Sequence, residues 1–214
     1  MRIIAFAGLA QSGKTTAAQM AAESAFNSGY SPMLANFAGP LKKACEMIGA
    51  DKASNPDLYR KVCQFLGASL RDPKFVPGVT GCDYWTDQMD ATLRQAEQDE
   101  GKRLDSKHPS GLFYETVVII DDVRYMNEIA TIRKWGGTTV FIDAFRRLDL
   151  PTDWEDLPQW RKDPSEEVAW WYTAGRHDDD LFDYGLVNNY DMDKLRDGIE
   201  TMMPVWTGEM PSVQ

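Results

Sequence analysis

Short apolar runs of strand length alternate with longer stretches that have the spacing or composition of helices. The run from Arg2 to Ala7 ends at a glycine-containing turn, and the stretch after it is rich in Ala, Gln, Met and Glu. A second apolar run is followed by Pro40, and proline is common in the first turn of a helix. The pattern predicts strands at 2–7 and 33–38 and helices at 15–26 and 41–48.

The second half of the chain continues this alternation after a long helical region. Residues 55–103 have a helical pattern, which two prolines and two glycines interrupt at 72–81. The remaining pattern predicts strands at 116–120, 138–142 and 184–187, and helices at 128–135, 165–172 and 192–202. We expect Ser165 to cap the helix that it opens.

Alternating strands and helices predict an α/β domain, with a central parallel sheet of about five strands and helices on both faces. A chain of 214 residues suits a single domain, with a core at 1–38, 116–145 and 165–214 and a helical insertion at about 39–115. Residues 146–164 contain three prolines, two tryptophans and many charges. This composition favours a mobile covering segment over a core element.

Composition and charge narrow the classes of function. Hydrophobic residues make up 43% of the chain and charged residues 26%, which is typical of a globular protein and excludes a disordered one. The net charge of -10 opposes attraction to nucleic acid or to an anionic membrane, so we expect neither as a partner. A ligand that carries phosphate would have to bind in a local pocket.

Cysteine and histidine usage points to a reduced compartment. The three cysteines include no CxxC pair and the chain has two histidines, which excludes a zinc finger. No apolar run approaches the roughly 20 residues needed to cross a bilayer. The chain enters a strand pattern directly at Met1 rather than a signal peptide. We therefore expect a cytoplasmic protein.

The loop between the first predicted strand and helix carries the clearest chemical signal. Residues 8–15 read GLAQSGKT and match the P-loop pattern GxxxxGK[ST] at every fixed position. In such a loop backbone N–H groups surround the β-phosphate, the lysine reaches the β- and γ-oxygens, and the hydroxyl ligates Mg²⁺. The motif specifies the expected fold as the three-layer P-loop NTPase fold. The predicted ATP-binding residues are Ala10, Gln11, Ser12, Gly13, Lys14, Thr15 and Thr16.

A second part of such a site follows the third predicted strand. Asp121 and Asp122 come directly after its apolar residues, where a carboxylate can hold Mg²⁺ directly or through water. With Thr15 they form the predicted metal site, and the sequence leaves open which aspartate serves it. Arg124 lies on the same rim and suits a second phosphate, with a surface ion pair to Glu128 as the alternative.

Six segments, in this order, resemble the phage-type deoxynucleoside monophosphate kinase family. They are GLAQSGKTT at 8–16, FAGPLK at 37–42, CQFLGASLR at 63–71, DDVRYMNE at 121–128, PSEE at 164–167 and LVNNYDMDKL at 186–195. The resemblance spans nearly the whole chain. It implies transfer of the γ-phosphoryl group of ATP to a deoxynucleoside monophosphate and a fold similar to that of adenylate and dephospho-coenzyme A kinases. It also implies the host cytoplasm as the location if a phage encodes the protein.

The resemblance further implies an acceptor site. By this likeness the monophosphate is held by Lys42, Arg71 and Arg124. The rest of the implied acceptor-binding set is Phe37, Gln64, Trp85, Asn127 and Glu128. The chain departs from the family at Gly39, where an acidic residue is usual, and at Ala68, where a threonine is usual. Both departures lie on the acceptor side and concern the choice of base.

Cations stand at both ends of the covering segment at 146–164. Arg146 and Arg147 open it, and Arg161 and Lys162 lie near its far end. Such a segment could fold as a lid over the phosphates and stabilise the transferring group, while a solvated charged loop is the alternative. The predicted catalytic residues are Lys14, Arg124, Arg146 and Arg147.

The sequence therefore predicts a P-loop kinase that uses ATP with Mg²⁺ as donor and a deoxynucleoside monophosphate as acceptor. A kinase of another small metabolite, such as dephospho-coenzyme A, is the enzyme alternative. A P-loop switch or motor is the alternative from another class, but the acidic charge and the clustered acceptor-side cations argue against it. The state of assembly is open, and a homodimer is one option.

Overall fold

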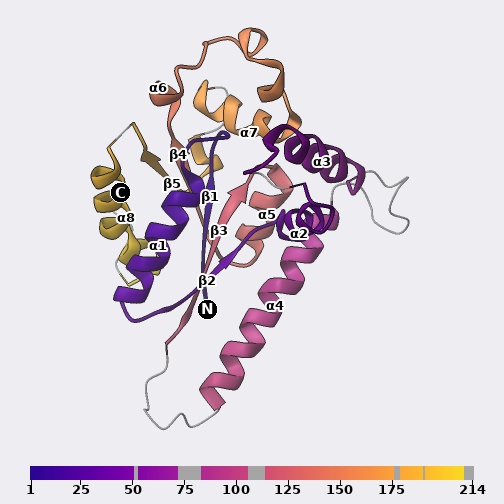
Figure 1. Ribbon diagram of the computed structural model, residues 1–214. Helices are drawn as coiled ribbons and strands as arrows, with labels where there is room; N and C mark the ends of the chain where they lie inside the picture. The colour runs from indigo at the N-terminus through magenta and orange to yellow at the C-terminus, as the bar shows by residue number, and fades with distance from the viewer. Residues whose placement is uncertain (51–52, 72–82, 106–113, 176–178, 190, 210–214) are drawn as a thin grey trace.

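The computed structural model describes residues 1–50, 53–71, 83–105, 114–175, 179–189 and 191–209 (Figure 1). Within these residues five strands form one sheet in the order β2-β3-β1-β4-β5, and every neighbouring pair is parallel. The strands are β1 (Arg2–Ala7), β2 (Ser31–Ala35), β3 (Thr116–Val123), β4 (Thr138–Asp143) and β5 (Tyr184–Val187). The prediction of an α/β fold with a parallel sheet of about five strands is confirmed.

The two central strands are buried on both faces, and this burial explains their continuous apolar runs. Residues 4–6 of β1 and 117–120 of β3 have no exposed surface. β3 is longer than predicted, because it continues through Asp121 and Asp122 to Val123. The two aspartates are therefore part of the strand itself. β2 begins and ends earlier than predicted, so the 37–42 segment starts beyond the strand.

Two helices cover one face of the sheet, α1 (Lys14–Asn27) and α8 (Met192–Trp206) (Figure 1). Ala17, Ala21 and Ala25 on α1 are fully buried against the strands, and these small side chains let the helix lie close to the sheet. The Trp206 ring of α8 packs edge-on against Phe6 of β1, with ring centroids 5.9 Å apart. Both helices were predicted, and α8 runs four residues further than expected.

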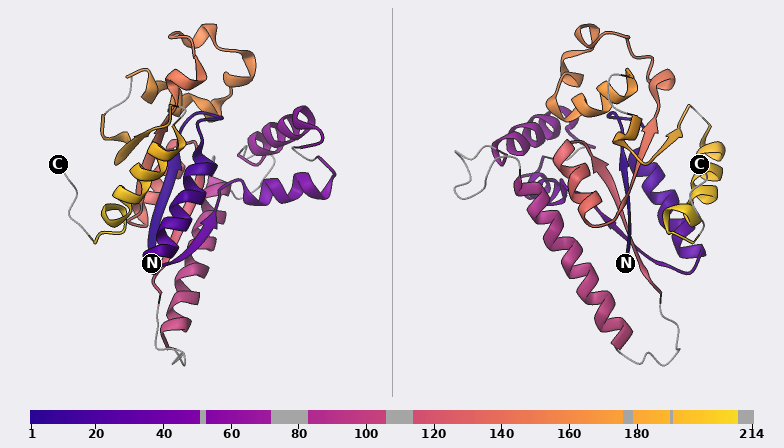
Figure 2. Two further views of the ribbon diagram at one scale, coloured as in Figure 1. Left: turned by 60° about the vertical axis from the view of Figure 1, so that its left-hand side comes forward. Right: turned by 180° about the vertical axis from the view of Figure 1, so that it is seen from behind.

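The opposite face is covered by α4 (Tyr84–Asp105), α5 (Met126–Lys134) and α7 (Pro164–Thr173) (Figure 1). α5 starts two residues before its predicted bound. α2 (Gly39–Met47) and α3 (Pro56–Ser69) pack on each other and extend from the side of the core, as the left view of Figure 2 shows. The predicted helical insertion thus contains α2, α3 and α4, and its predicted interruption at 72–81 lies outside the described residues.

Residues 145–164 cross the carboxyl edge of the sheet as short helical turns (Figure 1). They are α6 (Phe145–Leu148), η2 (Trp154–Asp156) and η3 (Gln159–Arg161), and a further turn, η4 (Asp179–Leu181), precedes β5. Leu157 and Arg161 are buried, so the segment packs on the core at these points. The predicted cap of α7 is wrong, because the Asp163 side chain caps the helix by accepting the Ser165 N–H at 2.9 Å.

The described helices include none that is long and apolar enough to span a membrane. Cys45 and Cys63 form no disulfide, and their sulfur atoms lie 3.4 Å apart between α2 and α3. Cys82, His108 and His177 lie outside the described residues.

Candidate active site

The candidate site lies at the carboxyl edge of the sheet, where the loop after β1 enters α1. β1 has β3 on one side and β4 on the other, so the chain leaves β1 toward β2 and later crosses to the other half of the sheet. Open α/β sheets bind ligands in the crevice outside the strand ends at such a reversal. Residues that follow β1, β3, β4 and β5 meet here.

Backbone geometry explains two glycines of the loop. Gly8 has a φ of +143° and Gly13 a φ of +100°, which are conformations that favour glycine. A Cβ on Gly8 would lie 2.7 Å from the Ile142 carbonyl oxygen, and a Cβ on Gly13 would lie 2.3 Å from Asn188 Nδ2. α1 begins after Gly13 with no side-chain cap there and no acidic residue in its first turn. Its first N–H groups are therefore suited to bind an anion.

Lys14 is folded back onto its own loop. Its Nζ donates hydrogen bonds to the carbonyl oxygens of Gly8 at 2.7 Å and Leu9 at 2.8 Å, and 7% of the residue is exposed. Burial lowers the pKa of Lys14 to about 7, and the nearby Arg124 guanidinium acts in the same direction. An anion bound at the loop would favour the ammonium form, so binding of negative charge would raise this pKa.

The two aspartates of β3 have different surroundings. Thr15 Oγ1 donates to Asp121 Oδ2 at 2.8 Å, and Asp121 Oδ1 is buried without a hydrogen-bond partner. Asp122 instead accepts the backbone N–H groups of Phe37 at 2.8 Å and Ala38 at 3.0 Å. Burial raises the pKa of Asp122 above its usual range. Asp121 is therefore the carboxylate beside the loop, and Asp122 holds the chain that leads into α2.

The donor set beside the loop suits a hard cation. A hydroxyl and a carboxylate oxygen are the ligands that Mg²⁺ takes, so Thr15 and Asp121 fit this ion. In the described part of the chain no group of three or more His, Cys, Asp or Glu side chains could hold a metal ion. Mg²⁺ keeps several waters and uses phosphate oxygens, so two protein ligands are in keeping with it. Lys42 lies close by, with Nζ 3.7 Å from Asp122 Oδ2 and 4.0 Å from Asp121 Oδ1.

Arg124 is tied to the loop through Glu166 of α7. Its Nη1 pairs with Glu166 Oε1 and donates to Ser165 Oγ at 3.3 Å. The other carboxylate oxygen of Glu166 accepts the backbone N–H of Ala10 at 2.5 Å. The sequence alone assigned no role to Glu166, although it lies in one of the six family-like segments.

Arg71 is held next to Arg124 by a shared carboxylate. Its Nη2 lies 3.2 Å from Glu128 Oε1, and Glu128 Oε2 accepts the backbone N–H of Arg124 at 2.8 Å. The Arg71 guanidinium carbon lies 4.0 Å from the Tyr125 ring centroid, and Nη1 donates to Gly67 O at 2.9 Å. Burial raises the pKa of Glu128 to about 7. The alternative of a surface ion pair between Arg124 and Glu128 is wrong, because Glu128 is buried and pairs with Arg71, while the Arg124 guanidinium pairs with Glu166. Tyr125 supports Arg71 without a signal in the sequence pattern.

The covering segment brings two arginines to the loop. Arg161 Nη2 donates to Gln11 Oε1 at 3.2 Å, and Arg147 Nη2 donates to Gln11 O at 2.5 Å. Arg147 Nε also donates to Asn188 O at 3.1 Å. Arg146 lines a separate pocket of about 370 Å³ between α6, α7 and β5. Of the predicted lid pair, Arg147 reaches the loop and Arg146 lies in this other pocket.

The remaining acceptor candidates differ in their exposure. Trp85 is buried with its ring centroid 5.8 Å from the Arg71 guanidinium carbon, and Phe37 is buried in the core. Gln64 is exposed on α3, and Asn127 is half-buried in the first turn of α5. Trp85 and Phe37 are therefore packed in the core, and little of either side chain is exposed to a ligand.

Asn188, which follows β5, supports the loop and was not a predicted site residue. Its Nδ2 donates to Ser12 O at 2.7 Å, and the residue is buried. Ser12 is buried as well, and its N–H donates to Leu9 O at 3.0 Å. The position of Asn188 at the carboxyl end of a parallel strand was the signal in the sequence that could have identified it.

Comparison with known proteins adds no family to this picture. No protein-family model and no curated protein matches the chain. Lys14, Arg124, Arg147 and Arg161 surround the loop or contact it, and Arg71 adjoins Arg124, in a chain whose net charge is -10. Such a local gathering of cations suits a ligand, or two ligands, with several negative charges.

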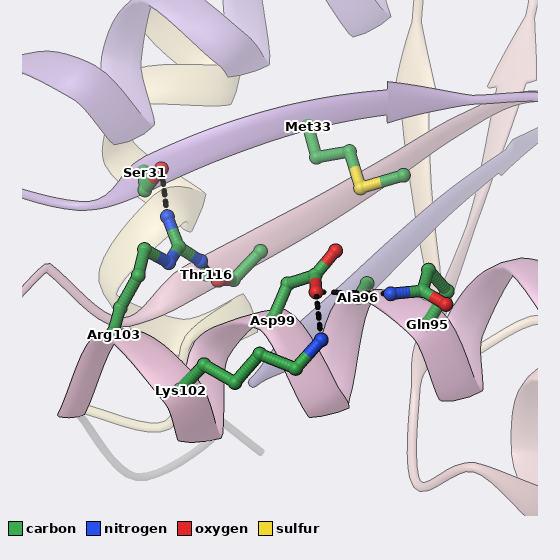
Figure 3. Close-up of a pocket in the computed structure, with 8 residues that line it drawn as sticks. All are labelled: Ser31, Met33, Gln95, Ala96, Asp99, Lys102, Arg103 and Thr116. Atoms are coloured by element: carbon green, nitrogen blue, oxygen red, sulfur yellow. Dashed lines mark hydrogen bonds and ion pairs between the residues drawn. The ribbon is translucent and has the colours of Figure 1, made fainter. Parts of the chain in front are cut away.

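A second pocket lies at the amino ends of the strands, away from this site (Figure 3). It has a volume of about 500 Å³, and its lining comes from β2, β3 and α4. Its charged groups contact one another or the strands: Lys102 Nζ lies 3.1 Å from Asp99 Oδ1, and Arg103 Nη1 donates to Ser31 Oγ at 3.2 Å. The carboxyl edge therefore remains the candidate active site.

Proposed function

We propose that the protein transfers the γ-phosphoryl group of ATP to a deoxynucleoside monophosphate, giving a deoxynucleoside diphosphate and ADP. One observation carries the proposal: a continuous row of contacts joins two arginines to the loop that precedes α1. The row runs Arg71, Glu128, Arg124, Glu166, Ala10. Phosphoryl transfer between two anions needs cationic positions for both phosphates side by side, and this row supplies them. The deoxynucleoside part rests on the family resemblance.

The donor phosphates are proposed to bind the loop. Lys14 would turn from the loop carbonyls to the β- and γ-oxygens, and the first N–H groups of α1 would bind the β-phosphate. Thr15 and Asp121 would hold Mg²⁺, which neutralises charge on the β- and γ-oxygens when bound. The separate contacts of Asp122 favour Asp121 for this role.

The acceptor phosphate is proposed to bind between α2, α3 and the end of β3. Arg71 and Arg124 would each present an arginine fork, and Lys42 a point charge. The contacts of Arg71 with Glu128, Tyr125 and Gly67 fix its orientation before the ligand arrives. Transfer needs no general base, because the attacking phosphate oxygen is already ionised.

The covering segment is proposed to exclude water from the transferring group. Arg147 and Arg161 already contact the loop, so a modest shift would bring them to the phosphates. Excluding water strengthens the electrostatic contacts in the site and prevents hydrolysis of ATP. The role of Arg146 stays a prediction.

An acceptor panel tests this function. Purified protein is incubated with ATP and Mg²⁺, alone and with dTMP, dGMP, dCMP, dAMP, their ribose counterparts or dephospho-coenzyme A, and ADP release is measured. We expect release that depends on a deoxynucleoside monophosphate. A Lys14→Met protein purified in parallel is the control for ADP release by contaminating kinases.

The other outcomes separate the alternatives. ADP release without any acceptor would contradict a kinase and favour a switch or motor. Release with dephospho-coenzyme A alone would favour a kinase of another metabolite. No release under any condition would overturn the proposed function.

A further inference from the structure

Glu166 places a buried negative charge among the groups proposed to bind phosphate. Its side chain is 4% exposed. One carboxylate oxygen accepts the Ala10 N–H at 2.5 Å, and the other pairs with Arg124 Nη1. The carboxylate also lies close enough to Lys14 to stabilise its ammonium form. A loop N–H and a guanidinium thus contact one carboxylate, which also acts electrostatically on the Lys14 ammonium.

These partners come from the two halves of the proposed site. Ala10 belongs to the loop proposed to hold ATP, and Arg124 belongs to the proposed acceptor site. A carboxylate and a phosphoryl group take the same donors, because both are anions with oxygens that accept charge-assisted hydrogen bonds. The carboxylate lies between the donor and acceptor sides, which is where a phosphoryl group passes during transfer.

We propose that, in the free protein, the Glu166 carboxylate occupies the position that the transferred phosphoryl group takes when ATP binds. In the free protein its carboxylate neutralises Arg124 and the loop, and it withdraws when the γ-phosphate of ATP takes its place. This inference rests on the proposed function. It adds that, before ATP binds, a carboxylate of the protein itself occupies groups that are proposed to bind phosphate.

The contacts around Glu166 explain how its carboxylate can move away from the loop. Glu166 lies in the first turn of α7, directly after the covering segment. Arg161 of that segment donates to Ala10 O at 3.2 Å and Arg147 donates to Gln11 O, so three side chains from 145–166 hold the same two loop residues. Phosphates that replace these contacts would let Glu166 withdraw with the start of α7, while Arg147 and Arg161 turn from the loop to the phosphates. Binding of ATP is thereby coupled to movement of the covering segment.

Titration calorimetry with ATP and with ADP tests the inference. Glu166→Gln keeps the shape of the side chain and removes its charge. We expect this variant to bind ATP about tenfold tighter than wild type and to bind ADP within about twofold of wild type, because only ATP carries the phosphoryl group that competes. The matched control is Glu167→Gln, which removes an exposed carboxylate from the same helix and should leave both affinities unchanged.

If Glu166 only forms a structural ion pair, its replacement should not raise the affinity for ATP. Loss of the buried partner of Arg124 would then weaken ATP binding or leave it unchanged, and either result overturns the inference. Equal tightening for ATP and ADP would also overturn it, since the carboxylate would then not occupy the γ-position. Wild-type protein that binds neither nucleotide would overturn the proposed function, and the inference with it.

If Glu166→Gln does not fold, a second variant provides the test. Glu166→Asp keeps the charge and shortens the side chain by one methylene, so its carboxylate reaches the Ala10 N–H less well. We expect ATP affinity to rise in this variant too, by about threefold, with ADP affinity unchanged. Unchanged or weaker ATP binding in a folded Glu166→Asp protein would overturn the inference independently.

Discussion

Replacing Lys14 with methionine removes the ammonium group and keeps most of the length of the side chain. In the structure this group is buried and donates to Gly8 O at 2.7 Å and Leu9 O at 2.8 Å. In the proposed reaction it turns to the oxygens of the transferring group, where its charge matters most in the transition state. Loss of one preorganised neutral donor costs about 10²–10³ in kcat, and a full charge contributes more. We expect kcat to fall on the order of 10³ or more, equal to about 4 kcal/mol of barrier.

The stability of the fold should change much less than kcat in Lys14→Met. Two buried carbonyl oxygens lose their donor, at roughly 1–3 kcal/mol each. The variant also removes a buried ammonium group, whose desolvation costs several kcal/mol and whose pKa is lowered to about 7. These contributions to the free energy of unfolding oppose each other, so we expect a net change within about 2 kcal/mol and a shift in Tm below about 8 °C.

Steady-state ADP release with varied ATP and varied acceptor gives kcat and both KM values, and thermal unfolding checks the fold. Lys102→Met is a matched control, because the Lys102 side chain is 71% exposed on α4 and lies far from the carboxyl edge. It should retain wild-type turnover. A folded Lys14→Met protein that keeps more than about a tenth of wild-type turnover would refute the role assigned to the loop.

Three further predictions concern the acceptor site, the covering segment and pH. Arg124→Lys and Arg71→Lys should each raise the acceptor KM about tenfold, because lysine cannot reproduce the arginine fork, and Arg71→Lys should leave ATP affinity nearly unchanged. Weaker ATP binding with an unchanged acceptor KM would contradict this role. Arg147→Ala should slow transfer about tenfold at nearly unchanged single-ligand affinities, and amides 146–164 should gain hydrogen-exchange protection with two nucleosides joined by five phosphates. Equal protection in both states, with turnover unchanged, would reduce the segment to a surface loop. ATP affinity measured by calorimetry should fall as pH rises above about 7, because the pKa of Lys14 is about 7 in the free protein and a bound anion raises it, so that binding takes up a proton. An affinity that stays constant from about pH 6 to 9 would contradict this linkage.

The order of strands and helices was readable from the chain because each central strand is buried on both faces. The runs at 2–7 and 116–120 are each apolar at all positions but one, and burial on both faces of a parallel sheet favours this. The glycines of the loop were predictable as well, since Gly8 and Gly13 have positive φ values that follow from local backbone geometry. Boundaries were less certain, because β3 continues through two charged residues that an apolar pattern does not include.

Only the tertiary structure separated the two aspartates of β3. Successive side chains of a strand point to opposite faces, so extension of β3 through both residues sends them to different partners. Asp121 meets Thr15, and Asp122 meets the backbone of Phe37 and Ala38. These partners are far from the aspartates in the sequence, so the sequence alone could not distinguish Asp121 from Asp122.

The sequence by itself determined the parallel α/β order and the loop motif, while only the tertiary structure brought Glu166, Asn188 and Arg161 to that loop. Glu166 is 156 positions from Ala10, and Asn188 is 176 positions from Ser12. Local periodicity and turn chemistry act over a few residues, and they decide strands, helices and glycine positions. Contacts across more than 150 positions depend on how β4 pairs with β1, how β5 pairs with β4 and how α7 packs on the sheet. That packing is a property of the whole core, and no short segment of the sequence contains it.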